Sequence, residues 1–65
     1  VIHLTSDGNM GLNGSSWGGG EGVIFLADVS TVPGLTPSGG GVLYTRRGAL
    51  YYKGSSGTVT TLAPA

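Results

Sequence analysis

The sequence predicts an all-β fold without helices, built from short antiparallel strands and ending in a three-stranded meander. Three observations predict it. Fourteen of the 65 residues are glycine, a residue that weakens helix interiors and suits turns. Apolar and β-branched residues occur in short runs bounded by Gly, Ser, Asn and Pro, as is typical of strands. No window repeats apolar residues at helical spacing without an interruption by Gly or Pro.

Residues 1–22 are expected to form a glycine-rich, shaft-like segment. The run VIHLT at 1–5 is apolar and β-branched and predicts a strand. Residues 6–9, Ser-Asp-Gly-Asn, are a strong turn signal. Residues 10–12 then predict a short return strand. The stretch NGSSWGGGEG at 13–22 has the composition of a loop.

Residues 23–65 are expected to form a second module that begins with another strand. The run VIFLA at 23–27 is continuously apolar, as in strands that are buried on both faces. Residues 28–41 contain two prolines and four glycines and predict an extended, irregular connection. Within it, Pro33-Gly34 has the residues of a type II turn.

The last third of the chain predicts the meander. The runs VLYTR at 42–46 and ALYYK at 49–53 flank Arg47-Gly48, which is the spacing of a tight hairpin with positive φ at Gly48. A second turn at 54–57 leads to the strand TVTTL at 58–62. Both faces of this meander carry large apolar or aromatic side chains, whereas a sheet with one solvated face would alternate with polar residues. We therefore expect both faces to be covered.

The small size of the chain limits how it can be stabilised. A domain of 65 residues buries only about 60% of the surface that its unfolded chain exposes. Such domains usually need disulfides, a metal or oligomerisation. The chain has no Cys and one His, so a disulfide is excluded and a structural zinc site is not expected. We expect association with other chains to supply the stability, and we expect no cofactor.

Charge and hydropathy argue against two classes of partner. Three basic residues balance three acidic ones, for a net charge of zero, whereas nucleic-acid-binding proteins carry basic patches. No apolar stretch approaches the length of about 18 residues that a membrane span needs, and no signal-peptide pattern is present. We predict no nucleic-acid partner and no membrane insertion. Because the first residue is Val1 rather than Met, we expect a processed product or an excised domain.

The titratable residues do not predict a catalytic centre. Asp7 and Asp28 lie where turn-forming roles are common, Glu21 lies in a glycine loop, and His3 lies in the first predicted strand. No spacing among them favours an acid–base pair or a catalytic triad. The glycine loop also lacks the Gly-Lys-Ser/Thr ending of a phosphate-binding loop. We therefore expect that the chain is not an enzyme.

One kind of binding site is suggested by aromatic residues. Aromatic side chains with a polar tip can stack on sugar rings, although tyrosines on strands also fill cores and interfaces. Trp17 is isolated in a predicted loop, and with Asn13 and Tyr51 it forms the candidate glycan-binding set.

Three stretches resemble a known class of proteins. Residues 39–65, GGGVLYTRRGALYYKGSSGTVTTLAPA, are similar to the C-terminal module of tail-fibre and minor tail proteins of tailed bacteriophages. Residues 4–14, LTSDGNMGLNG, resemble repeats of phage fibre shafts, and residues 22–41 resemble the segment that precedes the terminal hairpin. Thr45-Arg46-Arg47 departs from the family, in which acidic or small residues are common. The resemblance implies a virion component that is trimeric, with strands from three chains sharing one core.

The leading hypothesis is therefore structural: a trimerising module of a phage tail fibre or tail protein involved in host attachment. The residues expected in the shared core are Val23, Ile24, Phe25, Leu26, Val42, Leu43, Leu50 and Tyr52. Two alternatives stay open. The module could bind a host cell-surface glycan, or it could be the non-catalytic tail of a phage polysaccharide-degrading enzyme.

Overall fold

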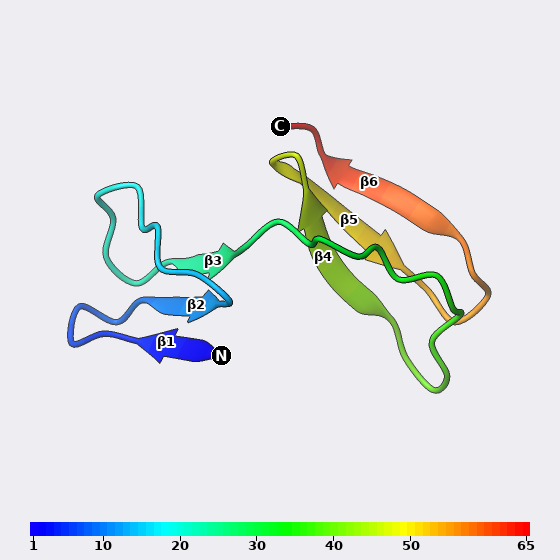
Figure 1. Cartoon of the computed structure of the whole chain (residues 1–65), viewed down its shortest axis with the longest axis horizontal. Helices are drawn as coiled ribbons and strands as arrows, with labels where there is room; N and C mark the ends of the chain where they lie inside the picture. The colour runs from blue at the N-terminus through cyan, green and yellow to red at the C-terminus, as the bar shows by residue number, and fades with distance from the viewer.

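The computed structural model describes all 65 residues and contains six strands and no helix, which confirms the predicted all-β class. The strands form two separate three-stranded sheets, with strand orders β1-β2-β3 and β4-β5-β6 (Figure 1). The structure contains no helix that is long and apolar enough to span a membrane. The strand bounds are β1 Ile2–Leu4, β2 Met10–Leu12, β3 Ile24–Leu26, β4 Val42–Arg46, β5 Ala49–Lys53 and β6 Val59–Ala63.

The first sheet combines a tight hairpin with a parallel pair. Strands β1 and β2 are antiparallel. They are joined through the predicted turn, in which Gly8 has a φ of 84° and its N–H donates to the carbonyl of Thr5 at 3.1 Å. Strand β3 then pairs with β2 in parallel after the glycine-rich loop 13–22. The boundary that we expected between two modules, at residues 22 and 23, lies between β2 and β3, inside the first sheet. The boundary between the two sheets lies between β3 and β4.

Asn9 holds the turn and the glycine-rich loop together. Its side chain is 2% exposed. The Asn9 Oδ1 accepts the N–H of Val23 at 2.9 Å, and its Nδ2 donates to the carbonyl of Gly20 at 3.1 Å. The Asn9 N–H donates to the hydroxyl of Thr5 at 3.2 Å. One amide side chain therefore fixes where the long loop returns to the sheet.

The second sheet is the predicted antiparallel meander. Strands β4 and β5 pair from Val42 opposite Lys53 to Arg46 opposite Ala49. The two-residue loop between them has positive φ at both Arg47 (51°) and Gly48 (82°), which is the conformation of a type I′ hairpin turn. Strand β6 completes the sheet, with a bulge between Leu50 and Tyr51.

The connection between the sheets is irregular, as predicted, but the expected type II turn at Pro33-Gly34 is wrong. That turn needs a positive φ at its glycine, and Gly34 does not have one. The carbonyl of Pro33 instead accepts a hydrogen bond from the Nζ of Lys53 at 2.9 Å. The connection therefore follows the second sheet and is anchored there by a buried lysine.

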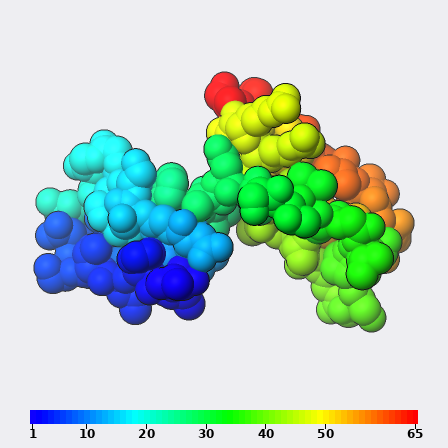
Figure 2. All heavy atoms as spheres, viewed as in Figure 1, coloured from blue at the N-terminus to red at the C-terminus, as the bar shows by residue number.

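The fold buries very little of itself. Four of 65 residues are buried, and Ala49 is the single apolar side chain among them. Figure 2 shows two lobes joined at a narrow waist. The radius of gyration is 12.9 Å, compared with about 11 Å for a compact domain of this length. The chain by itself therefore lacks the core that an independent domain would have.

Candidate assembly surface

One face of the first sheet is made entirely of aliphatic side chains. Residues that are paired across neighbouring strands project from the same face of a sheet. The register therefore places two rows of three residues on one face, and we call these six residues the apolar face. The rows are Ile2, Leu12 and Leu26, and Leu4, Met10 and Ile24.

Four of the six residues of the apolar face are exposed, and Met10 and Leu26 are half-buried. Leu4 is 73% exposed, Ile24 66% and Ile2 62%. Burying a side chain of this kind fully contributes about 1.5–3 kcal/mol relative to leaving it exposed. Contiguous apolar surface of this sort marks an interaction site on a soluble protein. The six residues thus form an apolar surface that would be stabilised by contact with a partner.

The opposite face of the same sheet is covered by the chain itself over β2 and β3, while His3 on β1 is exposed. His3, Gly11 and Phe25 lie across it in register. The glycine-rich loop packs there: a Cβ on Gly11 would overlap the carbonyl oxygen of Gly14 and lie 2.9 Å from the Trp17 ring. A Cβ on Gly14 would in turn meet the ring of Phe25. The glycines at 11 and 14 therefore permit the loop to close one face, and they leave the apolar face as the free one.

Hydrogen bonds join the two sheets at the waist. The hydroxyl of Thr45 donates to the carbonyl of Leu26 at 2.8 Å, and the N–H of Val29 donates to the carbonyl of Thr45 at 2.8 Å. The Asp28 carboxylate accepts the N–H of Gly48 at 3.0 Å, at the tip of the β4–β5 hairpin. Asp28 and Thr45 also form an isolated parallel bridge. The end of β3 is thus attached to the edge of β4.

Two hollows flank this waist, and both reach the apolar face. One, of about 380 Å³, is bordered by Ile24 and Leu26 of the first sheet and by Thr45 and Leu50 of the second. The other, of about 330 Å³, is bordered by Leu12, Leu26 and Leu43 among others. Leu26 borders both. Apolar side chains of both sheets therefore meet around the waist without filling it.

The second sheet also presents apolar residues on one face. Leu43 opposes Tyr52 across β4 and β5, and Leu50 opposes Thr45, so these four share a face. Leu43 and Tyr52 are exposed. This face reaches the waist hollows through Leu43 and Leu50.

The structure separates the eight residues expected in the shared core. Ile24 and Leu26 belong to the apolar face, and Leu43, Leu50 and Tyr52 share the exposed face of the second sheet. Phe25 and Val42 project from the opposite faces of their sheets, and Val23 precedes β3, where its N–H is bound by Asn9.

Sequence reasoning missed the other four members of the apolar face. Ile2 and Leu4 alternate with His3, and Met10 and Leu12 alternate with Gly11. This period-2 pattern was the available signal.

The three candidate glycan-binding residues lie apart. Trp17 packs over Gly11 on the covered face of the first sheet. Asn13 has a φ of 59°, and its Oδ1 accepts the amino group of Val1 at 2.8 Å. Tyr51 lies in the second sheet, stacked on Tyr44. They do not form one site.

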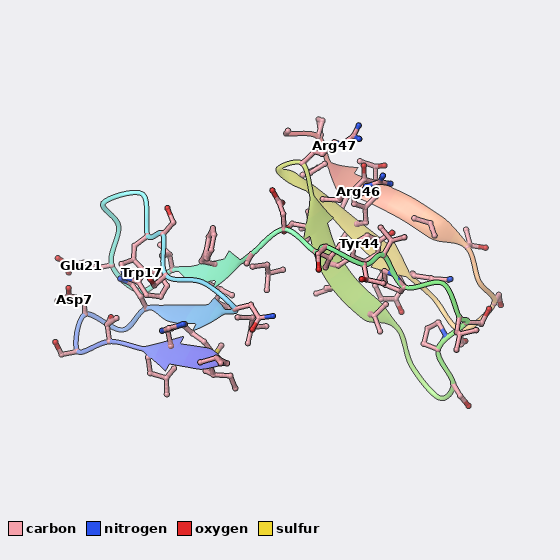
Figure 3. The ribbon with its side chains drawn as sticks, viewed as in Figure 1. Asp7, Trp17, Glu21, Tyr44, Arg46 and Arg47 are labelled. Atoms are coloured by element: carbon pink, nitrogen blue, oxygen red, sulfur yellow. The ribbon has the colours of Figure 1, made fainter.

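Two of the acidic residues are distant from the arginines, whereas the carboxylate of Asp28 is bonded to the hairpin turn that carries Arg47. Asp7 and Glu21 lie near Trp17 at the far end of the first sheet, whereas Arg46 and Arg47 lie at the tip of the second (Figure 3). Asp28 lies at the waist, and His3 lies on β1. No group of three His, Cys, Asp or Glu side chains is placed to hold a metal ion. The four candidate acid–base residues are not gathered around a common point.

Comparison with known proteins gives one informative similarity. No family model matches the chain, and no curated protein matches it. Among solved structures, it is similar to a hyaluronidase from Streptomyces koganeiensis, with 31% sequence identity and a TM-score of 0.58. The match covers 98% of this chain and 39% of the hyaluronidase chain. The chain thus resembles, over nearly its whole length, less than half of a polysaccharide-degrading enzyme.

Proposed function

We propose that this chain is a structural, non-catalytic segment that assembles with two further copies of itself through the apolar face. The supporting observation is the face itself: six aliphatic side chains in register, four of them exposed, on a chain with a single buried apolar residue. Three copies around a three-fold axis would turn three such faces toward one shared core. Closed cyclic symmetry of this kind is the usual arrangement of identical chains.

The area of the chain supports such an assembly. Its accessible surface is 4554 Å². A folded monomer of its mass, 6.4 kDa, would expose about 3,800 Å². The excess, roughly 750 Å², is close to the ~800 Å² that each partner contributes to a standard protein interface. The accessible surface of the chain therefore exceeds that of a folded monomer of its size by about the area of one standard interface.

The fibre hypothesis gives this assembly a biological setting. A trimeric module of a phage tail fibre, located in the virion and involved in host attachment, would use the apolar face as its inner surface. The resemblance of residues 39–65 and 4–14 to fibre modules supports this role. Peptides of this chain in purified virions would be the expected observation, and their absence from virions of a phage that encodes the chain would contradict it.

A second candidate function is favoured by the structural similarity. The chain would form the non-catalytic assembly segment of a polysaccharide-degrading protein, because it resembles part of a hyaluronidase. The full-length protein containing the chain would then depolymerise a polysaccharide, while the 65-residue segment alone would not. Viscometry of hyaluronan solutions with each of the two proteins distinguishes this role from that of a fibre without enzymatic activity.

The assembly itself is tested by the mass of the chain in solution. Light scattering coupled to size exclusion should give about 19 kDa, three times the mass of one chain. Ile24→Asp places a charge on the apolar face at a position that is 66% exposed in the single chain, so we expect loss of the trimer. Leu35→Asp is the matched control, because Leu35 is 87% exposed in the connection between the sheets. A folded 6.4 kDa monomer, or an Ile24→Asp variant that still assembles, would contradict the proposal.

A further inference from the structure

The chain contains two asparagines, and the structure places them in opposite environments. Asn9 is 2% exposed, and both polar atoms of its side chain are bonded, Oδ1 to the N–H of Val23 and Nδ2 to the carbonyl of Gly20. Asn13 is exposed at the start of the glycine-rich loop. Its Nδ2 donates none of the side-chain hydrogen bonds in the structure. The amide of Asn13 is therefore free to react where that of Asn9 is held.

The residues that follow the two asparagines differ in the same way. Asn9 is followed by Met10, whose N–H donates to the carbonyl of Val23 at 2.9 Å. Asn13 is followed by Gly14, which has no side chain to hinder an approach to its nitrogen. Gly14 lies outside the strands, and its N–H donates none of the backbone hydrogen bonds of the turns and loops. The nitrogen next to Asn13 is thus an unbound nucleophile beside an exposed amide.

The side-chain oxygen of Asn13 already has a hydrogen-bond donor. The nitrogen of Val1 donates to Oδ1 at 2.8 Å. Attack of a nucleophile on the Cγ of an amide places negative charge on this oxygen, and a donor held there stabilises that charge, as in an oxyanion hole. Asn13 and its neighbours therefore combine an unbound nucleophile, an unbound leaving group and a donor on the oxygen.

We propose that Asn13 and Gly14 form a site of spontaneous deamidation. The nitrogen of Gly14 attacks Cγ of Asn13, so that a new N–C bond closes a succinimide ring and the bond from Cγ to Nδ2 breaks. Nδ2 leaves as ammonia, with the proton that the Gly14 nitrogen loses. Solvent water then opens the ring. Cleavage at Cγ gives aspartate at residue 13, and cleavage at the main-chain carbonyl gives isoaspartate.

The two products would fit the structure differently. Asn13 has a φ of 59°, a conformation in which Asp is accepted as Asn is, so the aspartate product can keep the backbone. Isoaspartate carries the main chain through its side chain and lengthens it by one carbon immediately before Gly14. Gly14 is closely packed, since its carbonyl oxygen lies against Gly11 and a Cβ on it would meet the ring of Phe25. Isoaspartate should therefore displace the loop from β2 and β3.

The reaction is tested by incubating the wild-type chain in mildly alkaline buffer and locating deamidation by mass spectrometry of its peptides. We expect residue 13 to be converted at least about tenfold faster than residue 9, because Asn9 and the N–H of Met10 react only when the fold opens locally. Fragmentation that distinguishes the two isomers should find isoaspartate as well as aspartate at residue 13. An unchanged Asn13, or equal conversion of Asn9, would overturn the proposal.

A matched variant identifies the source of the ammonia. Asn13→Gln keeps a side-chain amide at the same exposed position but needs a larger ring for the same attack. It should release almost no ammonia in the period in which the wild type releases most of one equivalent. Equal release from Asn13→Gln would place the reaction elsewhere in the chain and overturn the site.

A second comparison separates the lengthened backbone from the new charge. Asn13→Asp supplies the charge without the extra carbon, so its Tm and the emission of Trp17, which packs on Gly11, should match the wild type. The purified isoaspartate form should shift the Trp17 emission toward that of an exposed indole and lower the Tm by about 4–8 °C. A protein-isoaspartate methyltransferase, which returns isoaspartate to aspartate, should restore both. An isoaspartate form with wild-type Tm and emission would overturn the displacement of the loop.

This site and the assembly can be tested separately. Peptide mass spectrometry reports the deamidation of Asn13 whether the chain is a monomer or a trimer, and light scattering reports the mass of the unmodified chain. Deamidation could thus be refuted while the assembly stands, and the reverse.

Discussion

The two sheets of this molecule are of equal strand number but are stabilised in different ways. The second sheet is a meander of five-residue strands, each joined to the next by a tight turn. The first has three-residue strands, and its β2–β3 pair is parallel and connected by an eleven-residue excursion from residue 13 to residue 23. That loop is held by Asn9 and packs on Gly11. The first sheet therefore depends on contacts between residues far apart in the chain, and on whatever covers its apolar face.

The different connections of the two sheets indicate at which step of folding self-assembly would take place. Closing a hairpin with a favourable turn loses little chain entropy. Closing the longer loop of a parallel pair loses more entropy before the contacts between the strands form. A three-residue strand also has few cross-strand contacts to offset that cost. We therefore expect the meander to form first and the first sheet to be completed with assembly. Thermal unfolding of variants at one fixed chain concentration measures this contrast.

The largest effect is expected at Gly11, at the centre of the first sheet. Gly11→Ala places a methyl group against the Gly14 carbonyl and the Trp17 ring. The loop would have to move off the sheet, so we expect a loss of about 3 kcal/mol, at the upper end of overpacking costs. Gly40→Ala is the control, since no atom lies within 4 Å of its added Cβ and Gly40 has no positive φ. Equal stability of the two variants would show that the loop does not cover the sheet.

Asn9 should give the next largest effect. Asn9→Ala leaves the N–H of Val23 and the carbonyl of Gly20 without their partner at a site that is 2% exposed. A buried polar group without a partner costs about 1–3 kcal/mol, and we expect a loss of about 2 kcal/mol. Asn13→Ala removes an exposed contact to the amino terminus and should cost less than 0.5 kcal/mol. Hydrogen exchange of the Val23 amide, faster in Asn9→Ala, would locate the change.

The contrast between the sheets also explains what the sequence could predict. The meander was predictable because its signals are local: Arg47-Gly48 between two runs of strand-forming residues specifies a hairpin. Strands near 1–5, 10–12 and 23–27 were also predictable from composition. The parallel pairing of β2 with β3 was not, because it depends on the distant contacts of Asn9 with Gly20 and Val23. The same pairing places Ile24 beside Met10, so the apolar face could be seen only once the register was known.

Gly34 shows a second limit of local signals. Pro33-Gly34 has the composition of a type II turn, yet Gly34 has no positive φ and the Pro33 carbonyl accepts a hydrogen bond from Lys53. A two-residue preference is thus not realised at a position where the chain also makes a tertiary contact with the second sheet. The position of Trp17, one of the candidate glycan-binding residues, was not predictable for the same reason. Nothing in the sequence indicated that Trp17 packs on Gly11.

Within the meander, a smaller effect is expected at the hairpin turn. Gly48 has a φ of 82°, a conformation that costs a residue with a Cβ about 1–2 kcal/mol. We expect Gly48→Ala to lower stability by about 1 kcal/mol, or about 4–8 °C in Tm for a domain of this size. Gly34→Ala, with no positive φ and no atom within 4 Å of the added Cβ, should be neutral or slightly stabilising. A neutral Gly48→Ala would mean that the hairpin does not adopt the type I′ turn.

The smallest effect should be a gain, at Arg47. It is the first central residue of the turn, with a φ of 51°, and Asn is favoured over Arg in this left-handed conformation. We expect Arg47→Asn to stabilise the chain by a few tenths of a kcal/mol. The matched change Arg46→Asn, on the adjacent strand residue, should be mildly destabilising, because Asn is disfavoured in strands. Since the turn lies in the meander, Arg47→Asn should raise the stability of the second sheet while hydrogen-exchange protection of the first stays unchanged. A parallel rise in both sheets would show that they fold as one unit, which would contradict the order of folding inferred from their different connections.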